Sequence, residues 1–315
     1  MNGQQEHVKH WIDRQAHRLD TFDPDAPLDD LRPLAGRIGD GARVVAVSGS
    51  TRQAHELSAL QHRLVRLLVE EHGFRSVALE GDDPTAAGLD AYVATGEGDP
   101  RAMLASARPF WRTEEIRGLV EWMRAHNVRN PDAPVRFAPT SAHPTSPPLE
   151  GLAGIERGLA EETLAWHEKT GDRIVYWGGI AHTAVGHPRT VSPPSPALTH
   201  RNAGSYLREH LGDGYVSVGL TFHHGELPFT APVPPADFAE SVLGTAEPAD
   251  FWWDLRADSV PEPVRTWLET PARTRLVGPA YDPADDAAHH LSGGALADWF
   301  DVLVHVRKVS PVRML

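Results

Sequence analysis

The chain alternates between short apolar runs and longer stretches in which apolar residues recur every three or four positions. The runs have the length of buried strands, and the longer stretches have the period of amphipathic helices. Strands are predicted at 43–47, 76–80, 135–139, 173–177, 215–222, 251–255 and 300–306, and helices at 6–20, 51–72, 113–127, 151–169 and 203–211. This alternation predicts an α/β fold in which helices flank a largely parallel central sheet.

The segment VAVSGSTRQAHEL at 45–57 joins a predicted strand to a predicted helix. Ser50 followed by Gln53 has the spacing of a capping box, which predicts that the helix begins at Thr51. Together, 43–47, 51–72 and 76–80 predict a βαβ unit with parallel strands and a right-handed connection. The later strand at 173–177 is expected to break at Gly178 and Gly179.

The sequence shows no sign of a boundary between domains. There is no internal repeat and no linker-like change in composition, so residues 1–315 are expected to form a single α/β domain. The core sheet and the site are placed in 40–225, and the strands and loops of 226–315 are expected to complete the domain. Residues 140–150 are interpreted as a loop.

Composition and charge narrow the function. The chain has no cysteine, which excludes disulfides, thiolate metal sites and cysteine nucleophiles. Its formal net charge of −13 argues against nucleic acid and anionic membranes as partners. It has no apolar run of about 18 residues and no signal-like N-terminus, so we expect a cytoplasmic protein.

No cofactor or metal is predicted. The loop at Gly49 lacks the dinucleotide-binding glycine pattern, and its Ser50 lacks the second glycine of a nucleophile elbow. The pairs His223-His224 and His289-His290 are not expected to chelate a metal, because adjacent strand residues point to opposite faces.

In largely parallel sheets, ligands bind beyond the carboxyl ends of the strands. Arg52 and Glu80 lie just beyond two such ends. Arg52 is interpreted either as a fixed cation for a ligand oxygen or as a solvated or internally paired arginine. Glu80 is either an acid/base group or a carboxylate satisfied by Arg52 or backbone amides.

His182 follows another strand end, and its imidazole titrates near neutral pH, which makes it a candidate general acid/base. The alternative is a structural histidine. His55 lies one turn beyond Arg52 and is a further acid/base candidate. Trp111 and Trp177 are predicted to lie near the cleft, where one of them would form an apolar wall for a bulky ligand, although core packing is the default for such residues.

Several stretches in order resemble the erythromycin esterase family: RVVAVSGSTRQAHEL with SVALEGD, FWRTEEIRGLVEWMRAHN, RIVYWGGIAHTAVG, YVSVGLTFHHGE and WFDVLVHV. The resemblance runs from about Trp11 to the end of the chain. It implies an erythromycin esterase-like fold, with the family's helical insertion shortened to about 151–169. It also implies a macrolactone ester hydrolase that activates water with glutamate and histidine side chains.

This sequence departs from the family at most of those positions. The resemblance places the first-motif glutamate on Gly49, the histidine base on Arg52 and the helix arginine on Gln61, which is retained as a substrate-binding candidate. It keeps the strand-end glutamate as Glu80. Of the later histidine pair, the first falls on Gly179 and only His182 remains.

An arginine is protonated at every working pH and cannot serve as a general base. We therefore expect a divergent esterase-like enzyme of bacterial secondary metabolism that uses acid/base chemistry, such as dehydration or cyclisation, in place of standard ester hydrolysis. Its expected substrate is a small molecule of polyketide or macrolide type, bulky and apolar. The alternative is a catalytically inactive homologue that binds a small molecule or a partner protein. The oligomeric state stays open.

Overall fold

The structure of the chain is a computed structural model that describes residues 3–81, 84, 87–140, 151–186, 189–193, 197–257 and 259–315. Its main sheet has the order β1-β10-β13-β8-β2-β5-β3-β4, with β9 paired to β8. Six consecutive strands from β13 to β4 are parallel, and β1, β10 and β9 pair antiparallel. The expected α/β class with a largely parallel sheet flanked by helices is confirmed.

The strands of this sheet are β1 (His17–Arg18), β2 (Val44–Gly49), β3 (Ser76–Leu79), β4 (Arg136–Ala138), β5 (Ile174–Gly179), β8 (Tyr215–Glu226), β9 (Thr230–Ala231), β10 (Asp250–Asp254) and β13 (Val302–Val309). The helices are α1 (Gly3–Gln15), α2 (Arg32–Ile38), α3 (His55–His72), α4 (Leu89–Thr95), α5 (Pro100–Leu104), α6 (Glu114–Arg129), α7 (Leu152–Thr170), α8 (Ile180–Thr183), α9 (Ala203–Leu211), α10 (Ala239–Leu243), α11 (Glu262–Glu269) and α12 (Leu296–Trp299).

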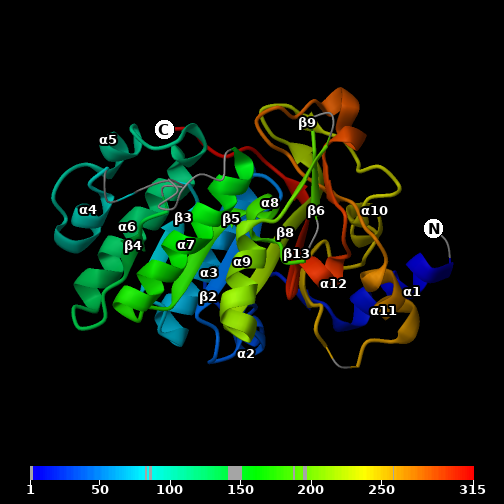
Figure 1. Ribbon diagram of the computed structural model, residues 1–315, viewed down its shortest axis with the longest axis horizontal. Helices are drawn as coiled ribbons and strands as arrows, with labels where there is room; N and C mark the ends of the chain where they lie inside the picture. The colour runs from blue at the N-terminus through cyan, green and yellow to red at the C-terminus, as the bar shows by residue number, and fades with distance from the viewer. Residues whose placement is uncertain are drawn as a thin grey trace.

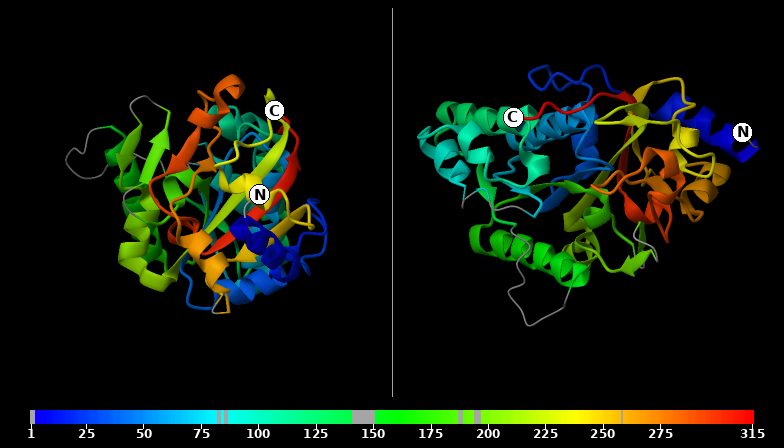
Figure 2. Two further views of the ribbon diagram at one scale, coloured as in Figure 1. Left: turned by 90° about the vertical axis from the view of Figure 1, so that its right-hand side faces the viewer. Right: turned by 90° about the horizontal axis from the view of Figure 1, so that it is seen from above.

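Helices cover both faces of the sheet (Figure 1). Alternate residues of β2 enter different cores: Val45 and Val47 pack with α2, α3 and α6, whereas Val44 and Ala46 pack with α7 and α9. A third core joins β10 and β13 to α1, α10, α11 and α12. The molecule is elongated, with α4 and α5 at one end and α1 and α11 at the other (Figures 1 and 2).

A second, antiparallel sheet was not predicted. It has the order β11-β12-β6-β7, from Thr274–Arg275, His290–Ser292, Arg189–Ser192 and Leu198–His200. Strands of two to four residues are too short for an alternating pattern to stand out in the sequence. This sheet supplies part of the wall of the site described below.

Two local predictions around the strand ends are wrong. Helix α3 begins at His55 and not at Thr51, and its N-cap residue Ala54 makes no side-chain cap. The C-terminal segment instead pairs with the backbone at the start of the helix. The His55 N–H donates to the Ser310 carbonyl, and Ala54 forms a β-bridge with Pro311.

Gly178 and Gly179 do not break the strand, since both pair with β2 as part of β5. Strand β5 also separates β2 from β3, so the predicted βαβ unit has parallel strands that are not neighbours. Most of the predicted loop at 140–150 lies outside the described residues. No helix in the described part of the chain has the length and apolar character needed to cross a membrane.

Candidate active site

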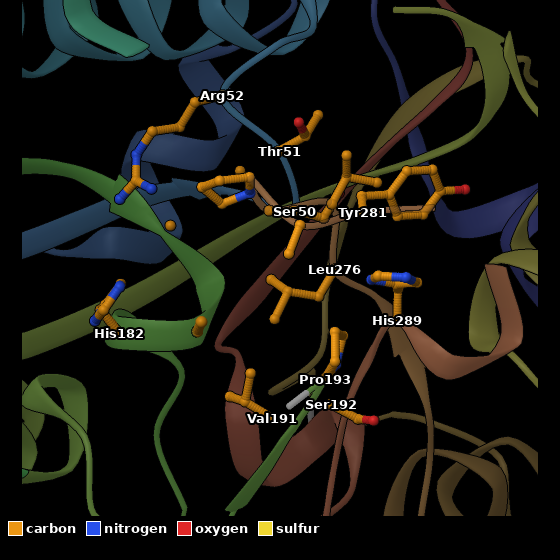
Figure 3. Close-up of a pocket in the computed structure, with 17 residues that line it drawn as sticks. Ser50, Thr51, Arg52, His182, Val191, Ser192, Pro193, Leu276, Tyr281 and His289 are labelled. Carbon is orange, nitrogen blue, oxygen red and sulfur yellow. The ribbon is translucent and has the colours of Figure 1, made fainter. Parts of the chain in front are cut away.

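A cavity of about 230 Å³ lies at the carboxyl ends of β2 and β5, where Gly49 and Gly179 are paired (Figure 3). The loop after β2 and helix α8 form one side, and β6 with the segment 276–281 forms the other. The described lining residues are Gly49, Ser50, Thr51, Arg52, Gly179, Ala181, His182, Val191, Ser192, Pro193, Leu276, Val277, Gly278, Pro279, Ala280, Tyr281 and His289.

Glu80 lies directly behind this cavity and is only 3% exposed. Its Oε1 pairs with Arg52 Nη2, and its Oε2 accepts a hydrogen bond of 3.1 Å from the Gly179 N–H. The Trp111 indole donates to the Glu80 carbonyl at 3.3 Å. Both carboxylate oxygens are therefore engaged, as a buried charge requires.

Arg52 crosses from the loop after β2 to Glu80. Its guanidinium carbon lies 4.6 Å from the ring centre of Phe110 and 5.4 Å from that of Trp111, within the range of cation–π contacts. Burial lowers the pKa of Arg52 to about 10, so the side chain stays protonated at neutral pH. Arg52 is thus a fixed positive charge at the cavity wall.

The two glycines at the end of β5 make room for this ion pair. A Cβ on Gly178 would overlap the Glu80 carboxylate and lie 2.9 Å from Tyr176 Cε1. A Cβ on Gly179 would lie 3.2 Å from Arg52 Nη2. The arginine therefore occupies space beside Gly179 that a larger side chain would need.

His182, on α8, faces both the cavity and a second buried carboxylate. Its Nδ1 lies 2.9 Å from Glu156 Oε1, and its Nε2 lies 3.6 Å from Glu80 Oε1. In the neutral imidazole, donation from Nδ1 to Glu156 leaves the lone pair on Nε2. That nitrogen is the one available for proton transfer.

Glu156 on α7 was missed in the sequence analysis. It is fully buried, and besides His182 it contacts Arg189 Nη2 at 2.9 Å, His200 Nε2 at 3.3 Å and the Ala203 N–H at 2.9 Å. Burial acts to raise its pKa, but His182, His200 and Arg189 outweigh that effect and lower the pKa to about 2. A carboxylate on the sheet-facing side of the predicted helix 151–169 was the available signal.

Part of the opposite wall comes from 276–281 and His289, in the part of the chain that was expected to complete the domain. The Val277 N–H donates to the Ser50 carbonyl at 2.9 Å, which fixes the segment 276–281 over the end of β2. Tyr281 donates to Asp286 at 2.6 Å, and its ring lies 4.8 Å from that of His289. His289 Nε2 accepts the Asp282 N–H at 3.0 Å, so its neutral ring carries the proton on Nδ1.

The structure brings Arg52, Glu80 and His182 together but places the other candidates elsewhere. His55 contacts Glu115 at 2.8 Å and lines a different cavity of about 480 Å³ beside α3 and α6. Gln61 is buried and donates to the Val47 carbonyl at 2.7 Å.

The two tryptophans, Trp111 and Trp177, are buried in the core and do not line the site cavity. Trp111 contacts the site through Arg52 and the Glu80 carbonyl. The apolar wall predicted from these indoles is formed instead by aliphatic residues of β6 and the segment 276–281.

The adjacent histidines His223 and His224 do not point to opposite faces of the strand as predicted. His223 Nδ1 and His224 Nδ1 lie 2.9 Å apart, so these adjacent side chains do meet. The register of β8 with β13 continues through this region, with His224 opposite Lys308 and Gly225 opposite Val309. Within the described ranges, no three His, Asp or Glu side chains are grouped so as to hold a metal ion.

Comparison with known proteins identifies the family of the chain. The family model described as erythromycin esterase matches residues 69–139 and 140–309, more than half of the chain. The chain belongs to the erythromycin esterase family. The resemblance seen in the sequence is confirmed.

Relatives of this erythromycin esterase family member include hydrolases. It is 31% identical over 116 residues to the putative hydrolase YbfO of Bacillus subtilis. This match covers 36% of this chain and 25% of the relative. It is 30% identical over 104 residues to erythromycin esterase type II of Escherichia coli, covering 33% and 24%. Each match spans about a quarter of the relative's length.

Solved structures share the fold at low identity. A succinoglycan biosynthesis protein superposes with a TM-score of 0.83 at 20% identity, covering 100% of both chains. A histidine-to-asparagine mutant of the erythromycin esterase EreC in its open conformation gives a TM-score of 0.68 at 12% identity, covering 94% of this chain and 98% of EreC. The erythromycin esterase fold is therefore retained almost throughout this chain.

Proposed function

We propose that this erythromycin esterase family member is an acid/base enzyme in which His182 transfers the proton. The observation that carries the proposal is the Glu156–His182 pair at 2.9 Å, with Nε2 on the side of Arg52 and Glu80. A buried carboxylate that fixes the tautomer and orientation of a histidine is a recurrent device for general acid/base catalysis.

In this proposal Glu80 does not transfer a proton. Its two oxygens are engaged by Arg52 and the Gly179 N–H, so a proton would have to displace one of these partners. Glu80 then acts by holding Arg52 in place. Arg52 supplies fixed positive charge for a negative oxygen of the substrate or of the transition state.

The chemistry proposed is proton transfer on a secondary metabolite, as in dehydration or cyclisation. The hydrolase names of the relatives favour hydrolysis as a starting point. However, the position that the family resemblance gives to a histidine base is held here by Arg52, which cannot take a proton from water. Proton transfer by His182 requires no second base at that position.

The test compares wild type with His182→Asn and uses His210→Gln as the control, because His210 is exposed on α9 and lies outside the site. The probes are erythromycin, followed by mass spectrometry, and small ketones and carboxylic acids in D₂O, followed by NMR for exchange of carbon-bound protons. Loss of the mass of water reports dehydration, whereas gain reports hydrolysis.

We expect proton exchange or dehydration in wild type and a loss of at least about 100-fold in His182→Asn. The control should retain wild-type rates. Turnover that survives in His182→Asn would refute the assignment. If wild type binds these probes and converts none of them, the alternative of a catalytically inactive binding homologue is favoured.

A further inference from the structure

The site cavity has two unlike walls. In Figure 3 Arg52 and His182 lie on one side, while Leu276, Tyr281 and His289 lie on the other and Val191 and Pro193 lie below. A ligand that fills the cavity therefore meets a charged and hydrogen-bonding group at one end. The rest of its surface meets mainly apolar side chains.

The charged wall favours a negative group. Arg52 is the only Lys, Arg, Asp or Glu among the described lining residues. Its side chain is 23% exposed, and one of its five N–H groups is used by Glu80 through Nη2. Glu80 itself does not line the cavity. A carboxylate at this wall would be close to opposite charge and would face no acidic side chain of the described lining.

The volume limits the body of the ligand. The cavity volume is about 230 Å³. Pockets that enclose drug-sized ligands occupy roughly 300–1,000 Å³. A carboxylate with a short alkyl chain fits this volume.

We infer that the ligand class of this site is a small monocarboxylate with a short apolar chain of about four to six carbons. The carboxylate lies against Arg52, and the chain packs on Leu276, Val277 and Val191. This inference rests on the proposed function for the site's role in catalysis, but it concerns binding and is tested without turnover.

The experiment is a calorimetric titration of the full chain at pH 7 with acetate, butyrate, hexanoate and decanoate. Hexanamide and hexylamine serve as neutral and cationic counterparts of hexanoate. Because each added methylene buries apolar surface, hexanoate should bind at least about tenfold more tightly than acetate. Decanoate should gain nothing over hexanoate, and both counterparts should bind at least about tenfold more weakly than hexanoate.

Two kinds of variant separate the walls. Arg52→Gln should remove the preference for hexanoate over hexanamide, and Arg52→Lys should keep part of it. Leu276→Ala should weaken hexanoate but leave acetate unchanged, and Leu198→Ala, at an exposed leucine outside the cavity, is its matched control. Thermal melting of each variant shows whether it is folded before its titration is interpreted.

The inference is overturned if hexanamide or hexylamine binds as tightly as hexanoate, or if no carboxylate binds folded wild type at millimolar concentration. These results leave the role of His182 intact. Conversely, carboxylate binding with the expected chain-length dependence, together with unimpaired turnover in His182→Asn, would overturn the proposed function and leave the ligand class standing.

Discussion

Replacement of Glu156 by glutamine is the most direct perturbation of the charge network behind His182. Glutamine keeps the shape of the side chain and one oxygen acceptor for the Ala203 N–H. It removes the negative charge that faces His182, Arg189 and His200. The change leaves Arg189, which is fully buried, without its opposite charge.

The magnitude follows from the pKa of Glu156. The surrounding cationic and hydrogen-bonding groups lower this pKa from an ordinary value of 4.5 to about 2, which corresponds to about 3 kcal/mol of stability at pH 7. Removal of one partner of a buried ion pair costs about 3–5 kcal/mol in other proteins. The two figures agree, so Glu156→Gln should lower the free energy of unfolding by about 3 kcal/mol at pH 7.

The sign of the pH dependence is fixed by the direction of the shift. Because the pKa of the folded state is the lower one, the contribution of Glu156 is complete above about pH 4.5 and declines as the pH falls toward 2. About half of it should remain near pH 3. The difference in stability between wild type and Glu156→Gln should shrink accordingly on acidification.

The assay is urea unfolding of both proteins at pH 7, 5, 4 and 3. Glu161→Gln is the matched control on the same helix, since Glu161 pairs with Arg157 at the surface and its loss should cost less than about 1 kcal/mol. The reasoning is refuted if the two substitutions cost the same at pH 7. It is also refuted if the cost of Glu156→Gln is unchanged between pH 7 and pH 3.

Three further predictions concern packing and charge elsewhere in the chain. Gly178→Ala should lower the free energy of unfolding by urea by about 1–3 kcal/mol, because the added Cβ overlaps the Glu80 carboxylate. Gly118→Ala is the control and should be neutral or stabilising, because its Cβ would have no atom within 4 Å. Equal effects of the two substitutions would contradict the prediction. Arg63→Met should lower the free energy of unfolding by about 3–5 kcal/mol in the same assay, because Arg63 is fully buried and Asp30 would lose its charge partner. A decrease of less than about 1 kcal/mol would contradict this prediction. The hydrogen bond from His55 to Glu115 on α6 raises the pKa of His55, so the protonated histidine stabilises the fold at low pH. His55→Gln should therefore lower Tm more at pH 5.5 than at pH 9. Equal losses of Tm at the two pH values would disprove this coupling.

Most of the main sheet could be predicted because its signals are local. The apolar runs at 43–47, 173–177 and 215–222 correspond to β2, β5 and β8, and strong helical periodicity predicted α6 and α7. The second sheet escaped prediction because its pairings join residues far apart in the chain, such as Leu291 with Val191. No local pattern records such pairings.

The start of α3 shows how a distant segment overrides a local signal. Ser50 and Gln53 have capping-box spacing, yet the Thr51 hydroxyl accepts the Gln53 N–H and the Gln53 carbonyl accepts the Val312 N–H. Those contacts hold 51–54 in an extended turn until His55. The loop consequently reaches further from β2 than the sequence predicted, and this places Arg52 over Glu80.

The rule that sites form at the carboxyl ends of parallel strands was sufficient to find Arg52, Glu80 and His182, because each follows a strand of one sheet. It could not find Glu156, which lies on helix α7, or Tyr281 and His289, which follow no strand of the main sheet. These residues reach the site through packing between elements, which only the three-dimensional arrangement reveals.

The replacements at 52 and 179 are physically coupled. The resemblance assigns histidines to both positions, but the arginine present at 52 extends to Glu80 and its guanidinium lies 3.2 Å from where a Cβ on Gly179 would be. A Cβ at 179 would crowd the arginine, and a glycine there with no arginine at 52 would leave Glu80 buried without its arginine countercharge. The two replacements are thus one structural change, and in the proposed mechanism that change leaves His182, oriented by Glu156, to transfer the proton.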